Sequence, residues 1–180
     1  MTRLMLKYKN EIAPALKSEL QIGNVYGVPK LDKIVINAGV GRVLQNNPKG
    51  LEAVTAALAK ITGQKPVITR AKKAISGFKI REGQTVGLVV TLRGKRMYDF
   101  LDKLVNIVMP RTRDFRGLSR SGFDHSGNYN LGLREHMVFP EIGETGPEGS
   151  FGFQITIATT AKNDNDGYAL LKKFNFPFKD

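Results

Sequence analysis

The chain has 180 residues, of which 41% are hydrophobic, and it carries a formal net charge of +12. This hydrophobic content supports a folded domain rather than a disordered chain, and the absence of cysteine excludes disulfides, thiolate metal sites and a cysteine nucleophile. The charge favours a polyanionic partner: nucleic acid is the first candidate and an anionic membrane surface the second, while a merely soluble basic domain is the remaining alternative.

The N-terminal sequence has charges spread through it and lacks the apolar run of a signal peptide. No apolar run approaches the roughly 18 residues that a membrane helix needs. We therefore expect no membrane insertion, and the lack of cysteine fits a reducing compartment.

One face of the first predicted helix is marked by apolar residues spaced four apart: Leu4, Tyr8, Ile12, Leu16 and Leu20. Pro14 predicts two short helical pieces or a kink. The β-branched run at residues 30–38 predicts a strand, and the glycines that follow it at positions 39 and 41 indicate a turn or a close approach to RNA. They do not complete a dinucleotide-binding fingerprint, because its third glycine would fall at Leu44.

Residues 58–81 carry the pattern most relevant to function. A helix that begins near residues 46–48 is predicted to end at Gly63, and a short strand follows at residues 67–69. The next stretch is basic and contains no acidic residue, which predicts a protruding loop between two strands; its cations are Arg70, Lys72, Lys73, Lys79 and Arg81. Basic side chains, hydroxyls and glycines at this density suit a surface that contacts phosphate. Ile75 and Phe78 either contact RNA or fold back to pack the loop.

The C-terminal half is predicted to contain strands at residues 84–93, 131–139 and 151–161, an amphipathic helix at 97–108 that Pro110 stops, and a last helix capped by Asn163. A second basic loop contains Arg111, Arg113, Arg116 and Arg120 among glycines and aromatic residues. This composition is typical of contact with folded RNA, or of a solvated loop. The acidic segment 140–149 either contacts a basic protein or forms a solvated turn, and its candidate bridging residues are Glu141, Glu144 and Glu148.

Candidate catalytic residues are sparse. His125 and His136 are too far apart in sequence for a local metal-ligand pair, and Asp124 is only a sequence neighbour of His125. The sequence lacks the short motifs of zinc proteases, serine hydrolases, phosphate-binding loops and calcium loops. We therefore expect no enzymatic activity, no cofactor and no metal.

The pattern L-x-x-I-T-G-Q-x-x-V-x-T-x-A-K-x-A at residues 58–74 resembles the signature of the bacterial large-subunit ribosomal protein L-five family. Residues 28–41 (VPKLDKIVINAGVG), 113–142 and 153–164 (FQITIATTAKND) also resemble that family, so the similarity covers nearly the whole chain. The resemblance implies an α+β fold in which helices pack on one face of an antiparallel sheet and long basic loops protrude. We expect a single domain over 1–180, with an N-terminal part at about 1–83 and a C-terminal part at about 84–180.

The resemblance also implies a function. A family member is a structural constituent of the large ribosomal subunit that binds 5S rRNA, attaches it in the central protuberance, contacts P-site tRNA and bridges to small-subunit protein S-thirteen. Large-subunit rRNA and neighbouring large-subunit proteins are further expected partners, and the expected location is the cytoplasmic ribosome. The alternative is a generic RNA-binding or RNA-processing protein outside the ribosome.

Carried onto this sequence, the resemblance assigns residues to two RNA surfaces. The rRNA-binding set is Asn37, Gly39, Gly41, Thr62, Gly63, Gln64, Lys65, Thr69, Arg70 and Arg93. The tRNA-binding set is Lys72, Lys73, Ser76, Lys79 and Arg81. We therefore expect residues 58–70 to form a fixed anchor and residues 71–81 to reach toward a second RNA.

Overall fold

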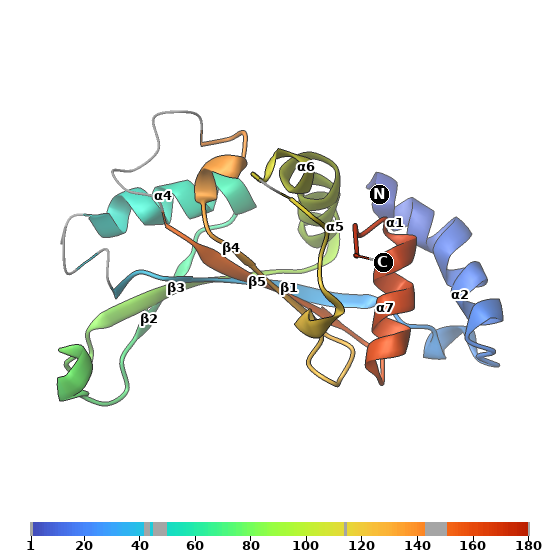
Figure 1. Cartoon of the computed structure of the whole chain (residues 1–180), viewed down its shortest axis with the longest axis horizontal. Helices are drawn as coiled ribbons and strands as arrows, with labels where there is room; N and C mark the ends of the chain where they lie inside the picture. Colours follow the sequence, from blue (N-terminus) through green and yellow to red (C-terminus); the bar gives the residue numbers. More distant parts are fainter. Residues whose placement is uncertain (1, 42–43, 45–49, 114, 143–150, 180) are drawn as a thin grey trace. The chain divides into compact units, whose positions relative to one another are not determined.

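The structure is a computed structural model that describes residues 2–41, 44, 50–113, 115–142 and 151–179. Within these residues, five strands form one antiparallel sheet in the order β2-β3-β1-β5-β4 (Figure 1). The strands are β1 Leu31–Gly39, β2 Val67–Arg70, β3 Thr85–Leu92, β4 Tyr129–Leu133 and β5 Phe153–Thr159. The predicted α+β fold is confirmed.

The α-helices are α1 Arg3–Lys7, α2 Ala13–Glu19, α4 Gly50–Thr62, α5 Gly94–Lys103, α6 Met109–Arg111 and α7 Asp164–Lys173. Two π-helical turns lie at Tyr8–Ile12 and Leu104–Val108, and 3-10 helices lie at Val25–Gly27, Ser76–Phe78, Arg120–Gly122 and His136–Val138. Among the described residues, every helix is too short or too polar to span a lipid bilayer.

Each π-helical turn directly precedes a proline that the sequence predicts to interrupt a helix. Pro14 lies in the first turn of α2 and Pro110 in the first turn of α6. In both places the backbone N–H that follows the π turn bonds to the carbonyl five residues earlier, from Ala13 to Tyr8 and from Met109 to Leu104. Proline lacks an N–H and its ring collides with a normal α-helical carbonyl. The wider π turn removes that conflict, so the helical path continues through both prolines.

Several predicted boundaries differ from the structure. The expected strand at residues 131–139 is shorter, because β4 ends at Leu133 and a 3-10 helix follows at His136–Val138. Gly63 ends α4 as predicted, with a left-handed φ of 66°, whereas the predicted start of that helix at 46–48 lies outside the described residues. The last helix begins as predicted, since the Asn163 side chain accepts a hydrogen bond from the Asp166 N–H.

The chain forms two compact units. Unit 1 comprises Met1–Ile34, Leu92–Leu131 and Thr156–Asp180, and unit 2 comprises Val35–Thr91 and Gly132–Ile155. The expected single domain with a division near residue 83 stays a prediction.

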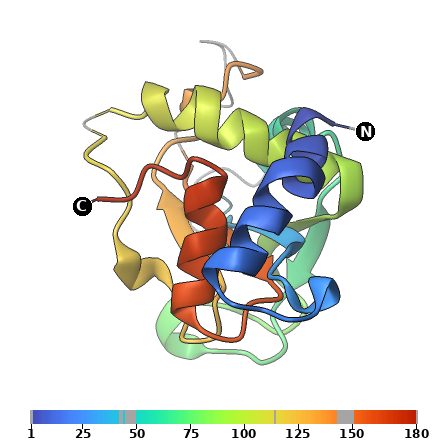
Figure 2. The same cartoon turned by 90° about the vertical axis from the view of Figure 1, so that its right-hand side faces the viewer.

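The helices α2 and α7 of unit 1 run side by side (Figure 2), and aromatic rings connect helices of this unit. The Tyr8 ring stacks on the Phe174 ring at a centroid distance of 6.0 Å, and Tyr98 contacts the same ring at 6.3 Å. Burial raises the pKa of Tyr8 to about 12. Ion pairs at the surface join α1 to α5 and α2 to α7: Arg3–Asp102 at 2.7 Å and Lys173–Glu19 at 2.9 Å.

Unit 2 has a buried and an exposed side to its strands. Ile36, Leu88 and Val90 are buried, as is the apolar stripe of α4, which lies over one face of these strands in Figure 1. The residues that alternate with them include exposed Asn37 and Thr91, along with half-buried Val35 and Val89. Because successive side chains on a strand point to opposite faces, one face of this unit presents hydrogen-bonding groups to solvent.

Candidate nucleic-acid interface

The turn between α4 and β2 is built by the Thr-Gly-Gln of the signature. Thr62 is buried, and its Oγ1 donates to the Leu58 carbonyl oxygen at 2.7 Å and accepts from the Gln64 N–H at 3.2 Å. Gly63 supplies the left-handed backbone, and Gln64 Nε2 donates to the Thr91 carbonyl oxygen at 3.2 Å. Thr62 therefore shapes the turn from inside the protein, and the turn itself is tied to β3.

Asn37 and Thr69 lie on either side of Gly87. In the β2–β3 pairing Thr69 is opposite Gly87. A Cβ atom at Gly87 would lie 2.7 Å from Thr69 Oγ1, 3.2 Å from the Ala38 carbonyl oxygen and 3.8 Å from Asn37 Oδ1. The structure thus places two predicted rRNA contacts together, an exposed amide and a half-buried hydroxyl, and Gly87 between them is buried.

Gly87 is a residue of this face that the sequence assignment missed. The available signal was a glycine inside a strand pattern, which often marks a close backbone approach. Gly39 and Gly41 differ, because a Cβ at either position would have no described atom within 4 Å. Packing within the chain therefore does not require glycine at these two positions.

The cations of the predicted rRNA set fall in two places. Lys65 and Arg70 are exposed residues of unit 2, before and at the end of β2. Arg93 belongs to unit 1, where its Nη1 lies 2.9 Å from Asp32 Oδ1 in an exposed ion pair. A phosphate at Arg93 would therefore have to compete with Asp32 or share the guanidinium with it.

The basic loop lies between β2 and β3 as predicted, and it has internal structure. Its base is closed by hydrogen bonds from Ala71 N to Gln84 O at 2.8 Å and from Gly83 N to Ala71 O at 3.0 Å. Ile75 and Ile80 form an antiparallel bridge around the 3-10 helix Ser76–Phe78. All five predicted tRNA contacts are exposed: Lys72, Lys73, Ser76, Lys79 and Arg81. Their arrangement on a closed hairpin presents the charges away from the sheet.

The apolar residues of this loop do not fold back onto it. The Phe78 side chain is 69% exposed, and Ile75 is also exposed. Phe78 and Lys79 line an open cleft of about 400 Å³ together with residues from β3 and the base of the loop. Of the two interpretations open from sequence, packing of the loop by these side chains is wrong.

The second basic loop mixes exposed arginines with one that is stacked. Arg111 ends α6, and Arg113 and Arg116 are exposed. The guanidinium of Arg120 lies 3.9 Å from the centre of the Tyr168 ring on α7. The C-terminal residues pair with this loop, because Leu118 N donates to Pro177 O at 2.8 Å. Arg120 therefore has a structural contact in addition to its charge.

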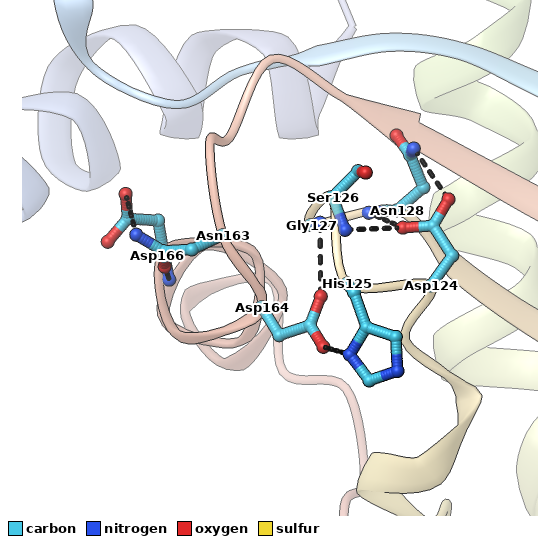
Figure 3. Close-up of polar contacts among 8 residues, drawn as sticks. All are labelled: Asp124, His125, Ser126, Gly127, Asn128, Asn163, Asp164 and Asp166. Atoms are coloured by element: carbon cyan, nitrogen blue, oxygen red, sulfur yellow. Dashed lines mark hydrogen bonds and ion pairs between the residues drawn. The ribbon is translucent and has the colours of Figure 1, made fainter.

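His125 has a different partner from its sequence neighbour Asp124 (Figure 3). Its Nδ1 lies 3.4 Å from Asp164 Oδ2 at the start of α7, and its side chain is 96% exposed. The Asp124 carboxylate accepts hydrogen bonds from the Ser126 and Asn128 N–H groups and from Asn128 Nδ2, and this bonding lowers its pKa. The two residues therefore fasten a turn and do not form an acid–base pair.

His136 is buried in unit 2. Its ring stacks on Phe151 at 4.1 Å, and its Nδ1 accepts a hydrogen bond from the Phe151 N–H at 3.3 Å. Burial lowers the pKa of His136. The described residues contain no group of three or more His, Cys, Asp or Glu side chains placed to hold a metal ion. Of the acidic bridge candidates, Glu141 is exposed, and Glu144 and Glu148 lie outside the described residues.

Two family models match consecutive parts of the chain. The model described as ribosomal protein L5 matches residues 24–81, and a second model, for the C-terminus of the ribosomal L5 family, matches residues 85–178. The chain belongs to the ribosomal protein L5 family. The family predicted from the sequence is confirmed.

Curated members of the L5 family resemble the chain over its full length. Proteins named large ribosomal subunit protein uL5 are 53% identical in Roseiflexus sp. (strain RS-1) and 55% identical in Nostoc sp. (strain PCC 7120). Each alignment covers 99% of this chain and 98% of the relative. The protein of the same name from Carboxydothermus hydrogenoformans is 52% identical, with 99% of both chains covered.

Proposed function

We propose that this chain is a structural constituent of the large ribosomal subunit, located on the cytoplasmic ribosome, and that it binds 5S rRNA and attaches it in the central protuberance. Its membership of the L5 family carries the proposal, because relatives at 52–55% identity over essentially the whole chain are named large-subunit proteins. The net charge of +12 gives independent support for a polyanionic partner. The role is one of binding and positioning, not catalysis.

The face around Gly87 is the proposed anchor for rRNA. Asn37 offers an exposed amide and Thr69 a half-buried hydroxyl, and the missing side chain of Gly87 leaves room for the Thr69 hydroxyl beside Asn37. Lys65 and Arg70 would neutralise phosphates nearby. This combination of hydrogen-bonding groups and nearby cations suits recognition of RNA shape.

The basic hairpin loop is the proposed contact for P-site tRNA. Its cations are exposed and project from a loop whose base is closed by backbone hydrogen bonds. The second basic loop, at Arg111, Arg113 and Arg116, would contact large-subunit rRNA or neighbouring proteins. Glu141, Glu144 and Glu148 are proposed to bridge to small-subunit protein S-thirteen, because acidic residues in a basic protein favour a basic partner.

Binding of purified protein to 5S rRNA over a salt series tests the main function. With about six phosphate contacts, affinity should fall on the order of a thousandfold between low and moderate salt. A flat salt response, or equal affinity for unrelated duplex RNA, would overturn the proposal and favour a generic RNA-binding protein outside the ribosome. A footprint on 5S rRNA in the same series locates the contact.

A double variant separates the two RNA surfaces. Lys72→Glu with Lys73→Glu reverses two charges on the hairpin loop, so tRNA contact on the assembled ribosome should weaken while 5S rRNA binding stays nearly intact. Lys65→Glu with Arg70→Glu is the matched control and should weaken 5S rRNA binding. Loss of 5S rRNA binding in the first variant would place the hairpin loop in the primary rRNA interface.

A further inference from the structure

The most exposed tyrosine or phenylalanine side chain among the described residues lies outside both proposed RNA surfaces. Tyr26 is 95% exposed, and its neighbour Val25 is 59% exposed. Both belong to the 3-10 helix Val25–Gly27, which comes directly before the first strand of the sheet. Burying a tyrosine ring is favourable, so a ring held fully in solvent marks a surface that gains from a partner.

The turn that carries Tyr26 is held in place by hydrogen bonds. Asn24 Oδ1 accepts from the Tyr26 N–H at 2.9 Å, and the Asn24 carbonyl oxygen accepts from the Gly27 N–H at 3.0 Å. The chain then enters the core at buried Val28 and Pro29. The Pro29 carbonyl oxygen accepts a hydrogen bond from the Tyr8 hydroxyl at 2.9 Å. The ring is thus displayed on a preformed turn, which lowers the entropic cost of binding.

Tyr26 differs from the other four tyrosines of the chain, each of which contacts at least one aromatic ring. Tyr8 and Tyr98 contact Phe174, and Tyr129 and Tyr168 contact Phe178. In the described part of the chain, Tyr26 has no ring contact. Core packing therefore explains four of these tyrosines and leaves Tyr26 without a structural role.

Positive charge lies next to this turn. Lys30 is exposed four residues after Tyr26, and its backbone is paired with Thr160: Thr160 N donates to Lys30 O at 2.9 Å, and Lys30 N donates to Thr160 Oγ1 at 3.0 Å. This pairing brings the segment with exposed Lys162 beside the segment with Lys30. Neither lysine has an acidic partner among the described residues. An exposed ring with exposed lysines on the adjoining segments suits a base and the phosphates on either side of it.

We propose that Tyr26 is a stacking platform for an unpaired base of rRNA, with Lys30 and Lys162 on the adjoining phosphates. The inference rests on the proposed function, and it adds an rRNA contact outside the predicted sets. Every base has a π-face, so stacking on an aromatic ring tolerates any base identity, and the cations supply affinity for the backbone. The chemistry favours RNA over a protein partner because charge and ring occur together.

The chain contains no tryptophan, so Tyr26→Trp introduces a single fluorescent reporter at the proposed contact. The variant is titrated with 5S rRNA and, separately, with large-subunit rRNA that lacks 5S rRNA, which distinguishes the two sources of the base. Stacking should quench the tryptophan emission at one of these RNAs and leave the affinity intact. Phe78→Trp, on the hairpin loop proposed for tRNA, is the matched reporter control, and neither rRNA should quench its emission.

Affinity measurements complete the test. Tyr26→Ala should weaken binding to the RNA that quenches the reporter roughly 5- to 150-fold, whereas Tyr26→Phe should bind like the wild type. The slope of log affinity against log salt concentration should be the same for Tyr26→Ala as for the wild type. Lys30→Gln should instead reduce the slope by about 0.7–0.9. Matching thermal unfolding curves check that the variants are folded, as the absence of described side-chain contacts leads us to expect.

The outcomes separate this inference from the proposed function. If 5S rRNA binds as proposed but neither RNA quenches the Tyr26→Trp reporter and Tyr26→Ala binds both normally, the platform is wrong and the ring serves another partner, such as a protein. If no variant and no wild-type protein binds rRNA, the proposed function fails and the platform fails with it. Quenching combined with a weakened Tyr26→Ala variant supports the platform.

Discussion

Gly87→Ala tests the proposed anchor face most directly, because the structure defines what a methyl group would meet there. The new Cβ would lie 2.7 Å from Thr69 Oγ1, which is closer than side chains tolerate, and 3.2 Å from the Ala38 carbonyl oxygen, which is backbone and moves little. Overpacking of this kind costs about 1–3 kcal/mol. Replacing glycine in a strand returns about 0.5–1 kcal/mol of backbone entropy, so the middle of the two ranges gives a net loss of about 1 kcal/mol.

Urea unfolding measures this loss as a shift in midpoint. With a slope of about 2 kcal/mol per molar urea, the midpoint should fall by roughly 0.5 M. Gly132→Ala is the matched control, since it also replaces a strand glycine but its Cβ would have no described atom within 4 Å. Its midpoint should stay the same or rise slightly.

A double variant identifies the collision as the cause. Thr69→Ala removes the hydroxyl that the new methyl would strike, so the double variant Thr69→Ala with Gly87→Ala should lose less stability than the two single variants added together, by more than about 0.5 kcal/mol. The folded Gly87→Ala protein should also bind 5S rRNA about tenfold more weakly, because the methyl would displace the Thr69 hydroxyl, which is one of the proposed rRNA contacts. An unchanged midpoint in Gly87→Ala, or strict additivity in the double variant, would refute this reasoning.

Three further predictions concern burial, backbone conformation and arginine stacking. Burial lowers the pKa of His136 below its ordinary value of 6.5, so below pH 6.5 the unfolded chain binds more protons than the folded chain. The contribution of His136 to stability should therefore be full above pH 6.5 and fall as the pH drops below it. Urea midpoints measured over this pH range should fall less in His136→Gln than in the wild type. Gly127→Ala should cost about 2–5 kcal/mol in thermal unfolding, because φ is 77° and the new Cβ would lie 2.8 Å or less from backbone and side-chain atoms; a normal unfolding curve would contradict this. Arg120→Ala should lose about 0.5–1 kcal/mol from its stacking on Tyr168, whereas Arg111→Ala should unfold like the wild type, and equal losses in both would argue against the stacking contribution.

Local patterns in the sequence predicted the elements whose residues decide their own conformation. The β-branched runs predicted β1 and β3, the apolar stripe predicted α5, and Asn163 marked the start of α7. The same holds for the turn at Gly63, which needs a left-handed backbone. In these places short-range sterics and capping bonds suffice, and no distant contact is needed.

The rest depends on contacts between residues far apart in sequence. Gln64 bonds to Thr91 across 27 positions, and the importance of Gly87 comes from Thr69 and Asn37 on two neighbouring strands. Thr62 belongs to the signature but lies inside the turn, which a linear motif does not reveal. Candidate site residues were therefore predictable by segment, while their exposure and their neighbours were not.

The π-helical turn at Tyr8–Ile12 also explains the spacing of the first apolar stripe. An α-helix has 3.6 residues per turn, so side chains repeated every four residues drift around its axis by about 40° at each step. Over the three steps from Leu4 to Leu16 the drift would reach about 120°, yet Leu4, Ile12 and Leu16 are all buried. The extra residue in the π turn takes up this drift and keeps the stripe in phase with the core. Deleting one residue from this turn would restore a regular α-helix, but it would also rotate one end of the apolar stripe out of the core. The same additional residue therefore serves two purposes, because it keeps the stripe buried and it accommodates Pro14.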